Sequence, residues 1–184
     1  MGKDLLLINP PSAFTSYCGT RANAVIQNYP LLSLAYLAAV ARRDGFSVSI
    51  LDLGIEFEPY RTLHKVLEEL SPRFIGITST TPIFPEVAAL SRIINNHLGS
   101  RTKLIIGGPH ASALPEEALK QSCFDILVFG EGEGALVEIL QEKPLREITG
   151  IYYKEERNIF KTEPREMTVN LDSLPFPAFD LYDI

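Results

Sequence analysis

Short apolar runs alternate along the chain with longer segments in which apolar residues recur at helical spacing. The runs end at Gly, Pro or polar residues, as "DLLLIN" does before Pro10 and Pro11, and such runs are typical of buried strands. In the longer segments the apolar side chains fall on one face, for example Leu63, Leu67 and Leu70. Strands are therefore predicted over residues 4–9, 47–53, 74–81, 103–106 and 126–129. Helices are predicted over residues 31–44, 60–70, 85–98, 115–120 and 135–140.

The alternation ends with two extended segments, residues 148–154 and 159–163, which flank "EERN" and predict a β-hairpin. Five near-continuous apolar strands interleaved with helices indicate a parallel sheet that is covered on both faces. The predicted fold class is α/β: a doubly wound, flavodoxin-like or Rossmann-like five-stranded parallel sheet with helices on both faces, plus a C-terminal β-hairpin. We expect residues 1–145 to form the sheet domain, 146–166 the appended hairpin and 167–184 a linker.

The last segment, "LDSLPFPAFDLYDI", combines two prolines with several large apolar or aromatic side chains. Burial of one such side chain stabilises by about 1.5–3 kcal/mol, so a segment of this kind is expected to be covered. We expect it to pack on a structure outside this chain. The alternative is that it lies on the domain itself.

Composition and charge narrow the range of partners. The chain has 184 residues, enough for one domain with a sizeable core, and a formal net charge of −6. Its longest basic cluster is the pair Arg42 and Arg43, which argues against a nucleic-acid-binding face. The apolar stretch 31–41 is too short to span a membrane. Two cysteines form neither a disulfide framework nor a zinc pattern, so a cytoplasmic location is expected.

Four unusual turns are predicted to meet at one edge of the sheet. The first, third, fourth and fifth strands end in "NPPSAF", "TSTTP", "GGPHAS" and "GEGEGA", whereas the turns at the opposite ends of the strands are plain. In an open parallel sheet, ligands bind outside the carboxyl ends of the strands. Gly107 and Gly108 would let a ligand approach the main chain, and Ser79, Thr80 and Thr81 offer hydroxyl groups beside them.

A long connection without a clear element lies between Pro11 and Pro30, where loops in such folds usually have about 2–6 residues. It carries Phe14, Tyr17 and Tyr29. A long aromatic loop over a glycine-lined floor suits a large, flat ligand better than a small metabolite.

Several more familiar sites are disfavoured. A dinucleotide-binding site requires Gly-x-Gly-x-x-Gly after the first strand. Here Pro10 and Pro11 occupy this turn, and proline has no backbone N–H to donate to a pyrophosphate. Asp52 alone is a weak mimic of a ribose-binding acid. Glu131 and Glu133, between the glycines after the fifth strand, would repel phosphate. No P-loop motif is present.

A response-regulator receiver would need acidic residues after the first and third strands, where Asn9 and Ser79 stand. His64 and His97 fall on predicted helices and are expected at the surface, so a histidine metal cluster is not expected. Cys18 lies in the long loop, where it could approach a ligand or be an inert thiol.

The ordered motifs resemble those of a known family. They are "NPP", "NYPLLSLAYLAAVARRDGFSVSILDL", "IGITSTT", "IIGGPHAS" and then "PEE", and "ILVFGEGE". In order and placement, the chain resembles the N-terminal cobalamin-binding (B12-binding) domain of cobalamin-dependent radical SAM enzymes, the group that includes magnesium-protoporphyrin ester cyclase and the radical SAM methyltransferases. The hairpin and the segment "LDSLPFPAFDLY" are similar to the segments that lie C-terminal to this domain in those proteins.

The resemblance implies a corrin across the strand ends, with its nucleotide tail inserted beside the third and fourth strands. It places Ser79 and Thr81 near the tail, and Gly107 and Gly108 where the tail needs space. It places Glu131 and Gly132 at the turn after the fifth strand, in contact with the tail or the edge of the corrin. A histidine is frequent at position 110, without a role that can be derived from the sequence. The candidate cofactor-binding residues are Asn9, Pro10, Pro11, Tyr29, Ser79, Thr80, Thr81, Gly107, Gly108, Pro109, His110, Gly130, Glu131, Gly132 and Glu133. No catalytic or metal-ligating residue is assigned.

Two departures shape the expected function. Many cobalamin domains carry Asp-x-His-x-x-Gly after the first strand, but this chain has no histidine before His64, so a base-off cobalamin without a protein imidazole is expected. The Cys-x-x-x-Cys-x-x-Cys motif for a 4Fe–4S cluster and S-adenosylmethionine is also absent. We therefore expect a module that presents cobalamin to a radical SAM domain of the same parent polypeptide, for methyl transfer or a related radical reaction. Alternatives are an interaction module with a vestigial site that docks that domain, and a stand-alone flavodoxin-like regulator or enzyme.

Overall fold

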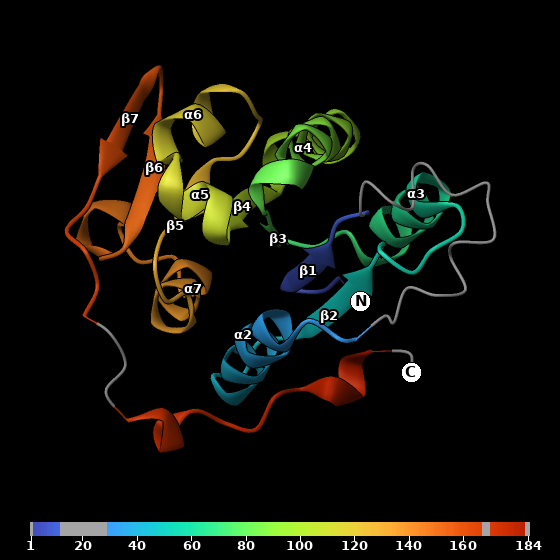
Figure 1. The fold of residues 1–184 in the computed structure, drawn as a ribbon, viewed down its shortest axis with the longest axis horizontal. Coiled ribbons are helices and arrows are strands. Elements are labelled where there is room, and N and C mark those ends of the chain that lie inside the picture. Colours follow the sequence, from blue (N-terminus) through green and yellow to red (C-terminus); the bar gives the residue numbers. More distant parts are fainter. Residues whose placement is uncertain (1, 12–28, 167–169, 183–184) are drawn as a thin grey trace.

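The computed structural model describes residues 2–11, 29–166 and 170–182 and contains a seven-stranded sheet of order β2-β1-β3-β4-β5-β6-β7 (Figure 1). The first five strands pair in parallel and confirm the doubly wound α/β prediction. The strands are β1 (Leu5–Asn9), β2 (Val48–Asp52), β3 (Phe74–Thr78), β4 (Lys103–Gly107), β5 (Ile126–Val128), β6 (Ile151–Glu155) and β7 (Asn158–Lys161).

The predicted hairpin forms and extends the sheet. Its first strand, β6, pairs antiparallel with β5, with Val128 opposite Ile151, and β7 pairs antiparallel with β6. The two strands are joined at Glu156, whose φ of 55° suits a tight turn. The result is one mixed sheet in which β5 is an internal strand.

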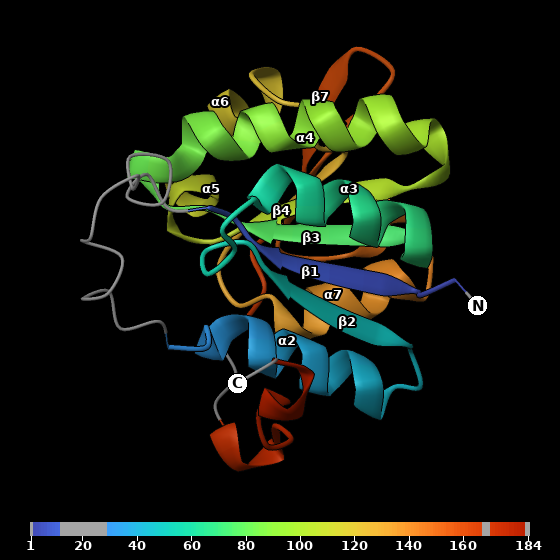
Figure 2. The ribbon, with the colours of Figure 1, turned by 90° about the vertical axis from the view of Figure 1, so that its right-hand side faces the viewer.

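Helices cover both faces of this sheet, as predicted (Figure 2). On one face, α3 and α4 pack with α5 and α6 over a core that includes Leu6, Ile75 and Leu104. On the other face, α2 and α7 pack over a core that includes Leu5 and Ile126. The alternation along each strand sends successive side chains to opposite faces, which explains the two cores. The helices are α2 (Leu32–Arg43), α3 (Pro59–Leu70), α4 (Phe84–Leu98), α5 (Pro109–Ala113), α6 (Pro115–Lys120) and α7 (Glu133–Leu140).

Two local predictions differ from the structure. The third strand, predicted to run to residue 81, ends at Thr78, because a 3-10 turn over Thr81–Ile83 leads directly into α4. The turn "GGPHAS" contains the short helix α5, which begins at Pro109, a residue whose fixed φ suits the first helical position.

The C-terminal segment 170–182 lies along the outer side of α2, so the alternative stated for it holds (Figure 2). Ala178 is buried and its N–H donates to the carbonyl oxygen of Ala35 at 3.0 Å. Arg42 donates to both carboxylate oxygens of Asp180, at 2.9 and 2.7 Å. Phe176 nevertheless stays 96% exposed.

Most of the long loop after Pro11, with Phe14, Tyr17 and Cys18, lies outside the described residues, so the prediction of an aromatic cover over the site stays a prediction. In the part of the chain that the structure describes, no helix combines the length and apolar character needed to cross a membrane.

Candidate functional site

A cavity of about 460 Å³ opens at the carboxyl ends of β3, β4 and β5, between the sheet and the helices α2 and α7. This is the edge of the sheet that the turn chemistry predicts as the binding edge. Of the three histidines in the chain, all of which lie in the described part, none lines this cavity.

The floor of the cavity consists of two rows of residues on neighbouring strands. The inner row pairs Leu7 with Gly76 and Gly76 with Ile105, so it is aliphatic apart from the glycine. The outer row, nearer the edge, pairs Thr78 with Gly107. A ligand entering from the edge therefore passes a hydroxyl group first and reaches an apolar interior.

The two adjacent glycines of β4 and its turn serve different purposes. A Cβ on Gly107 would meet only the carbonyl oxygen of Val128, at 3.8 Å, and would otherwise project into the cavity. Gly108 has a φ of 95°, and a Cβ there would lie 2.7 Å from Thr78 Oγ1 and 2.8 Å from the carbonyl oxygen of Ser79. Gly108 is thus required by the close approach of β3, whereas Gly107 leaves space for a ligand.

The walls of the cavity come from the N-terminal halves of α2 and α7. Ser33 and Leu37 line one side, and Glu133 and Leu136 line the other. The helices meet above the floor where a Cβ on Gly132 would lie 3.2 Å from Leu37 Cδ2. The cavity is therefore closed above by two helices and open toward the strand ends.

The residues predicted from the turns after β4 and β5 come together around this cavity. The lining residues among them are Gly107, Gly108, Pro109, Gly130, Glu131, Gly132 and Glu133. Their contact with a cofactor stays a prediction.

The predicted residues after β3 lie beside the cavity and do not line it. The side chain of Ser79 is fully buried, and its hydroxyl donates to the carbonyl oxygen of Thr80 at 3.2 Å. Thr80 and Thr81 are exposed. The strand alternation explains this, since Thr78 and Ser79 point to opposite faces and only the former faces α2 and α7.

His110 lies under α4, on the face of the sheet opposite the cavity. Only 3% of this residue is exposed, and its ring stacks on Phe84 with 4.0 Å between ring centroids. Nδ1 lies 3.4 Å from Thr81 Oγ1, and Nε2 has no hydrogen-bond partner among the described residues. The geometry thus assigns this histidine to the packing of the β3 and β4 turns and not to the cavity.

The predicted residues after β1 form a separate polar cluster at the β2 side of the sheet. Asn9 Nδ2 donates to Asp52 Oδ1 at 2.7 Å, and the Gly54 N–H donates to the same oxygen at 3.0 Å. Burial raises the pKa of the Asp52 carboxyl, although these two hydrogen bonds oppose the shift. Pro10 and Pro11 are buried. Tyr29, by contrast, is 72% exposed.

Sequence reasoning missed several lining residues, among them Ser33, Leu37, Gly76 and Thr78. Gly76 carried a usable signal, because a glycine inside a strand marks a close approach of another group. A Cβ at Gly76 would lie 2.8 Å from Leu7 Cδ2, which covers it. The two α2 residues carried no such signal, since the helix is apolar on nearly every side.

The site geometry suits an elongated, mostly apolar group that enters from the strand ends and remains attached to a larger body outside. Neutral aromatic rings match the aliphatic inner row, and the missing side chain at Gly107 provides a space that a Cβ would otherwise fill. A cobalamin, whose benzimidazole-bearing tail is attached to a bulky corrin, has this shape. The residues present therefore fit the group.

Comparisons with known proteins agree with this fit. A family model described as the B12 binding domain matches residues 22–140. The chain is 31% identical over 184 residues to an uncharacterized methyltransferase of Pyrococcus horikoshii, covering 96% of this chain and 38% of that protein. It is 26% identical over 231 residues to the cytidylyl-2-hydroxyethylphosphonate methyltransferase of Streptomyces wedmorensis, covering 98% of this chain and 40% of that protein.

Solved structures show the same fold. TsrM, a radical S-adenosylmethionine methyltransferase from Kitasatospora setae solved with cobalamin and a 4Fe–4S cluster, gives a TM-score of 0.73 at 22% identity, covering 96% of this chain and 31% of that one. OxsB, a cobalamin-dependent S-adenosylmethionine radical enzyme solved with aqua-cobalamin and S-adenosylmethionine, gives 0.72 at 20% identity, covering 98% of this chain and 24% of that one.

The chain therefore spans less than half the length of the curated relatives it matches, 38% of one and 40% of the other. The match to the family model covers most of the chain and includes the turns that line the cavity. From the cavity and these matches together, the chain belongs to the B12-binding domain family and resembles the cobalamin domain of cobalamin-dependent radical SAM methyltransferases.

Proposed function

We propose that this chain binds cobalamin with the nucleotide tail in the cavity between the sheet, α2 and α7, and with the corrin across the carboxyl ends of the strands. In this proposal it presents the corrin to a radical SAM domain of the same parent polypeptide, for methyl transfer or a related radical reaction. The 4Fe–4S cluster and S-adenosylmethionine belong to that other domain, because the two cysteines of this chain cannot supply the three-cysteine motif.

The observation that carries the proposal is the open space above Gly107. The position lies in a strand and a side chain there would fit the protein, yet the residue is glycine and faces an apolar cavity. A glycine that the fold does not require is explained if a ligand occupies the space.

When bound, cobalamin supplies cobalt-centred one-carbon and electron-transfer chemistry. The role of this chain is to bind and to orient it. The aliphatic inner row, Leu7 and Ile105, would exclude water from the tail. The carboxylates of Glu131 and Glu133, at the mouth, suit the amide donors of a corrin better than a phosphate.

The same geometry supports a base-off state. If the ligand's own benzimidazole lies in the cavity, it is not on cobalt, and His110 lies on the other face of the sheet, so it is not placed to replace it. We therefore propose that no histidine of this chain would bind the cobalt of the cofactor.

A titration with hydroxocobalamin tests the proposal, with cobinamide, which lacks the nucleotide tail, as the matched ligand. The purified chain should bind hydroxocobalamin and shift its absorption spectrum to that of a cobamide whose base has left the metal. Cobinamide should bind more weakly, because it cannot fill the cavity. If hydroxocobalamin at high micromolar concentration does not bind, the proposal is refuted and the interaction module that docks the catalytic domain is favoured instead.

A further inference from the structure

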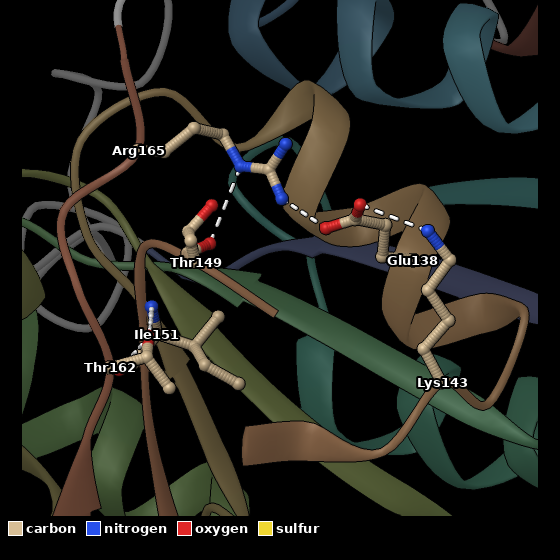
Figure 3. Close-up of polar contacts among 6 residues, drawn as sticks. All are labelled: Glu138, Lys143, Thr149, Ile151, Thr162 and Arg165. Carbon is tan, nitrogen blue, oxygen red and sulfur yellow. Dashed lines mark hydrogen bonds and ion pairs between the residues drawn. The ribbon is translucent and has the colours of Figure 1, made fainter. Parts of the chain in front are cut away.

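Arg165 comes after β7 in the chain and reaches across to α7, one of the two helical walls of the cavity (Figure 3). Its guanidinium forms an ion pair with Glu138, and both side chains are only 24% exposed. Glu138 is also paired with Lys143, whose Nζ lies 3.0 Å from Glu138 Oε1. Burial acts to raise the pKa of the Glu138 carboxyl, but the hydrogen bonds from Lys143 and Arg165 outweigh it and hold this pKa below its usual range.

The guanidinium also lies over the first turn of α7. A Cβ on Gly134 would lie 2.7 Å from Arg165 Nη1 and 3.3 Å from Cζ, so a side chain at this position would require the guanidinium to shift away from the helix. Gly134 and Glu138 are four residues apart and share one face of the helix, whereas Leu136 faces the cavity. Arg165 therefore holds α7 from the side opposite the ligand space.

The hairpin region contacts the same arginine side chain at its Nε and at its Cβ. Arg165 Nε donates to the carbonyl oxygen of Thr149 at 3.3 Å, and a Cβ on Gly150 would lie 3.2 Å from Arg165 Cβ. Close by, the Thr162 hydroxyl lies 3.1 Å from both the N–H and the carbonyl oxygen of Ile151 (Figure 3). The arginine is thus held between the hairpin and α7, which it contacts at Gly134 and at Glu138.

We propose that Arg165 is a positioning residue for the cofactor site, which fixes the first turn of α7 and with it Gly132 and Glu133 at the mouth of the cavity. This inference rests on the proposed function. Among the described residues, no second ion pair joins α7 to the hairpin region, and the pair with Lys143 lies within the end of the helix and its following turn.

Three variants test the inference. Arg165→Ala removes both contacts, and Gly134→Ala keeps the arginine but pushes its guanidinium away from the helix. Lys143→Ala is the matched control, because it removes a cation from the same carboxylate without touching Gly134 or the hairpin. For each, we would measure the dissociation constant and the dissociation rate of hydroxocobalamin, hydrogen exchange at residues 130–136, and the melting temperature.

We expect Arg165→Ala and Gly134→Ala to weaken hydroxocobalamin binding about 5- to 30-fold, through faster dissociation, and to speed exchange at residues 130–136. Lys143→Ala should match the wild type, and Arg165→Lys should recover only part of the affinity, since an ammonium cannot span both contacts. The inference is overturned if Arg165→Ala lowers the melting temperature but leaves affinity and dissociation rate unchanged, or if it behaves as Lys143→Ala does. A wild-type chain that binds no hydroxocobalamin would instead refute the proposed function.

Discussion

Replacement of the two adjacent glycines by valine separates the needs of the fold from those of the ligand. At Gly107, the nearest atom to a new Cβ is 3.8 Å away, and the backbone is that of a strand, in which valine is favourable. Loss of backbone freedom in the unfolded chain adds a stabilisation of about 0.4–1 kcal/mol. Gly107→Val should therefore fold with unchanged or slightly higher stability.

At Gly108 the same change meets two costs. Its backbone, with a φ of 95° and a ψ of −178°, lies in a region nearly restricted to glycine, where a residue with a side chain costs about 1–3 kcal/mol. Contacts of 2.7–2.9 Å with Thr78 Oγ1 and the backbone of Ser79 add about 1–3 kcal/mol. A total of about 2–6 kcal/mol lowers the melting temperature by roughly 4–24 °C in a chain of this size.

For hydroxocobalamin affinity we expect the larger loss at Gly107 and not at Gly108. The isopropyl group at Gly107 occupies cavity space, and the cost of forcing an atom group into a filled site, about 1–3 kcal/mol, corresponds to about 5- to 150-fold weaker hydroxocobalamin binding. Thermal unfolding and hydroxocobalamin titration of both variants measure the two effects, with Gly2→Val, at the far end of the sheet, as control. The reasoning is refuted if Gly107→Val unfolds as readily as Gly108→Val, or if it binds hydroxocobalamin as tightly as the wild type.

Four further outcomes are expected. A cobamide with adenine in place of dimethylbenzimidazole should bind about 5- to 150-fold more weakly, because its amino group would lose water in an apolar interior; equal affinity would contradict this. Burial, with the nearby Asp52 charge, raises the pKa of Tyr182 from 10.0 to about 12, so the protonated side chain favours the folded state. That stabilisation is complete below pH 10 and is lost as the pH rises to about 12, and Tyr182→Phe should abolish this dependence in a stability titration. Ala178→Glu should release the C-terminal segment in limited proteolysis, whereas Arg42→Ala, which breaks an exposed pair, should cost only about 0.2–1 kcal/mol. His110→Phe keeps the ring stacking and removes a buried nitrogen that has no hydrogen-bond partner in the described part of the chain, so thermal unfolding should show equal or higher stability and hydroxocobalamin affinity should not change.

The sequence was sufficient for most elements of the fold and for the edge of the sheet at which the cavity opens. Apolar runs bounded by glycine and proline mark buried strands locally, and parallel topology then brings their ends together. Gly107, Gly108 and the "GEGE" turn were found in this way. The docking of the hairpin on β5 was not, because strand pairing between distant segments depends on register and has no local signal.

Side-chain direction limited the prediction of the site itself. Adjacent residues of a strand point to opposite faces, so the choice between Thr78 and Ser79 depends on where the strand ends and which helices cover each face. The predicted strand ran three residues too far, and the hydroxyl groups chosen were those of Ser79, Thr80 and Thr81, none of which lines the cavity. Arg165 lies at the end of the predicted hairpin segment and in none of the motifs quoted for the site, so it drew attention only once Gly134 and Glu138 were seen beside it.

The antiparallel addition of β6 to β5 has a practical consequence for protein engineering. β5 has only three residues, and the Phe129 N–H, next to the mouth of the cavity, donates to the Gly150 carbonyl at 3.0 Å. A transplanted domain that ends before the hairpin would leave β5 as an exposed edge strand. Such a strand is prone to fray and to pair with strands of other molecules. A transplantable corrinoid-carrier module should therefore run through Arg165, so that the hairpin protects its border.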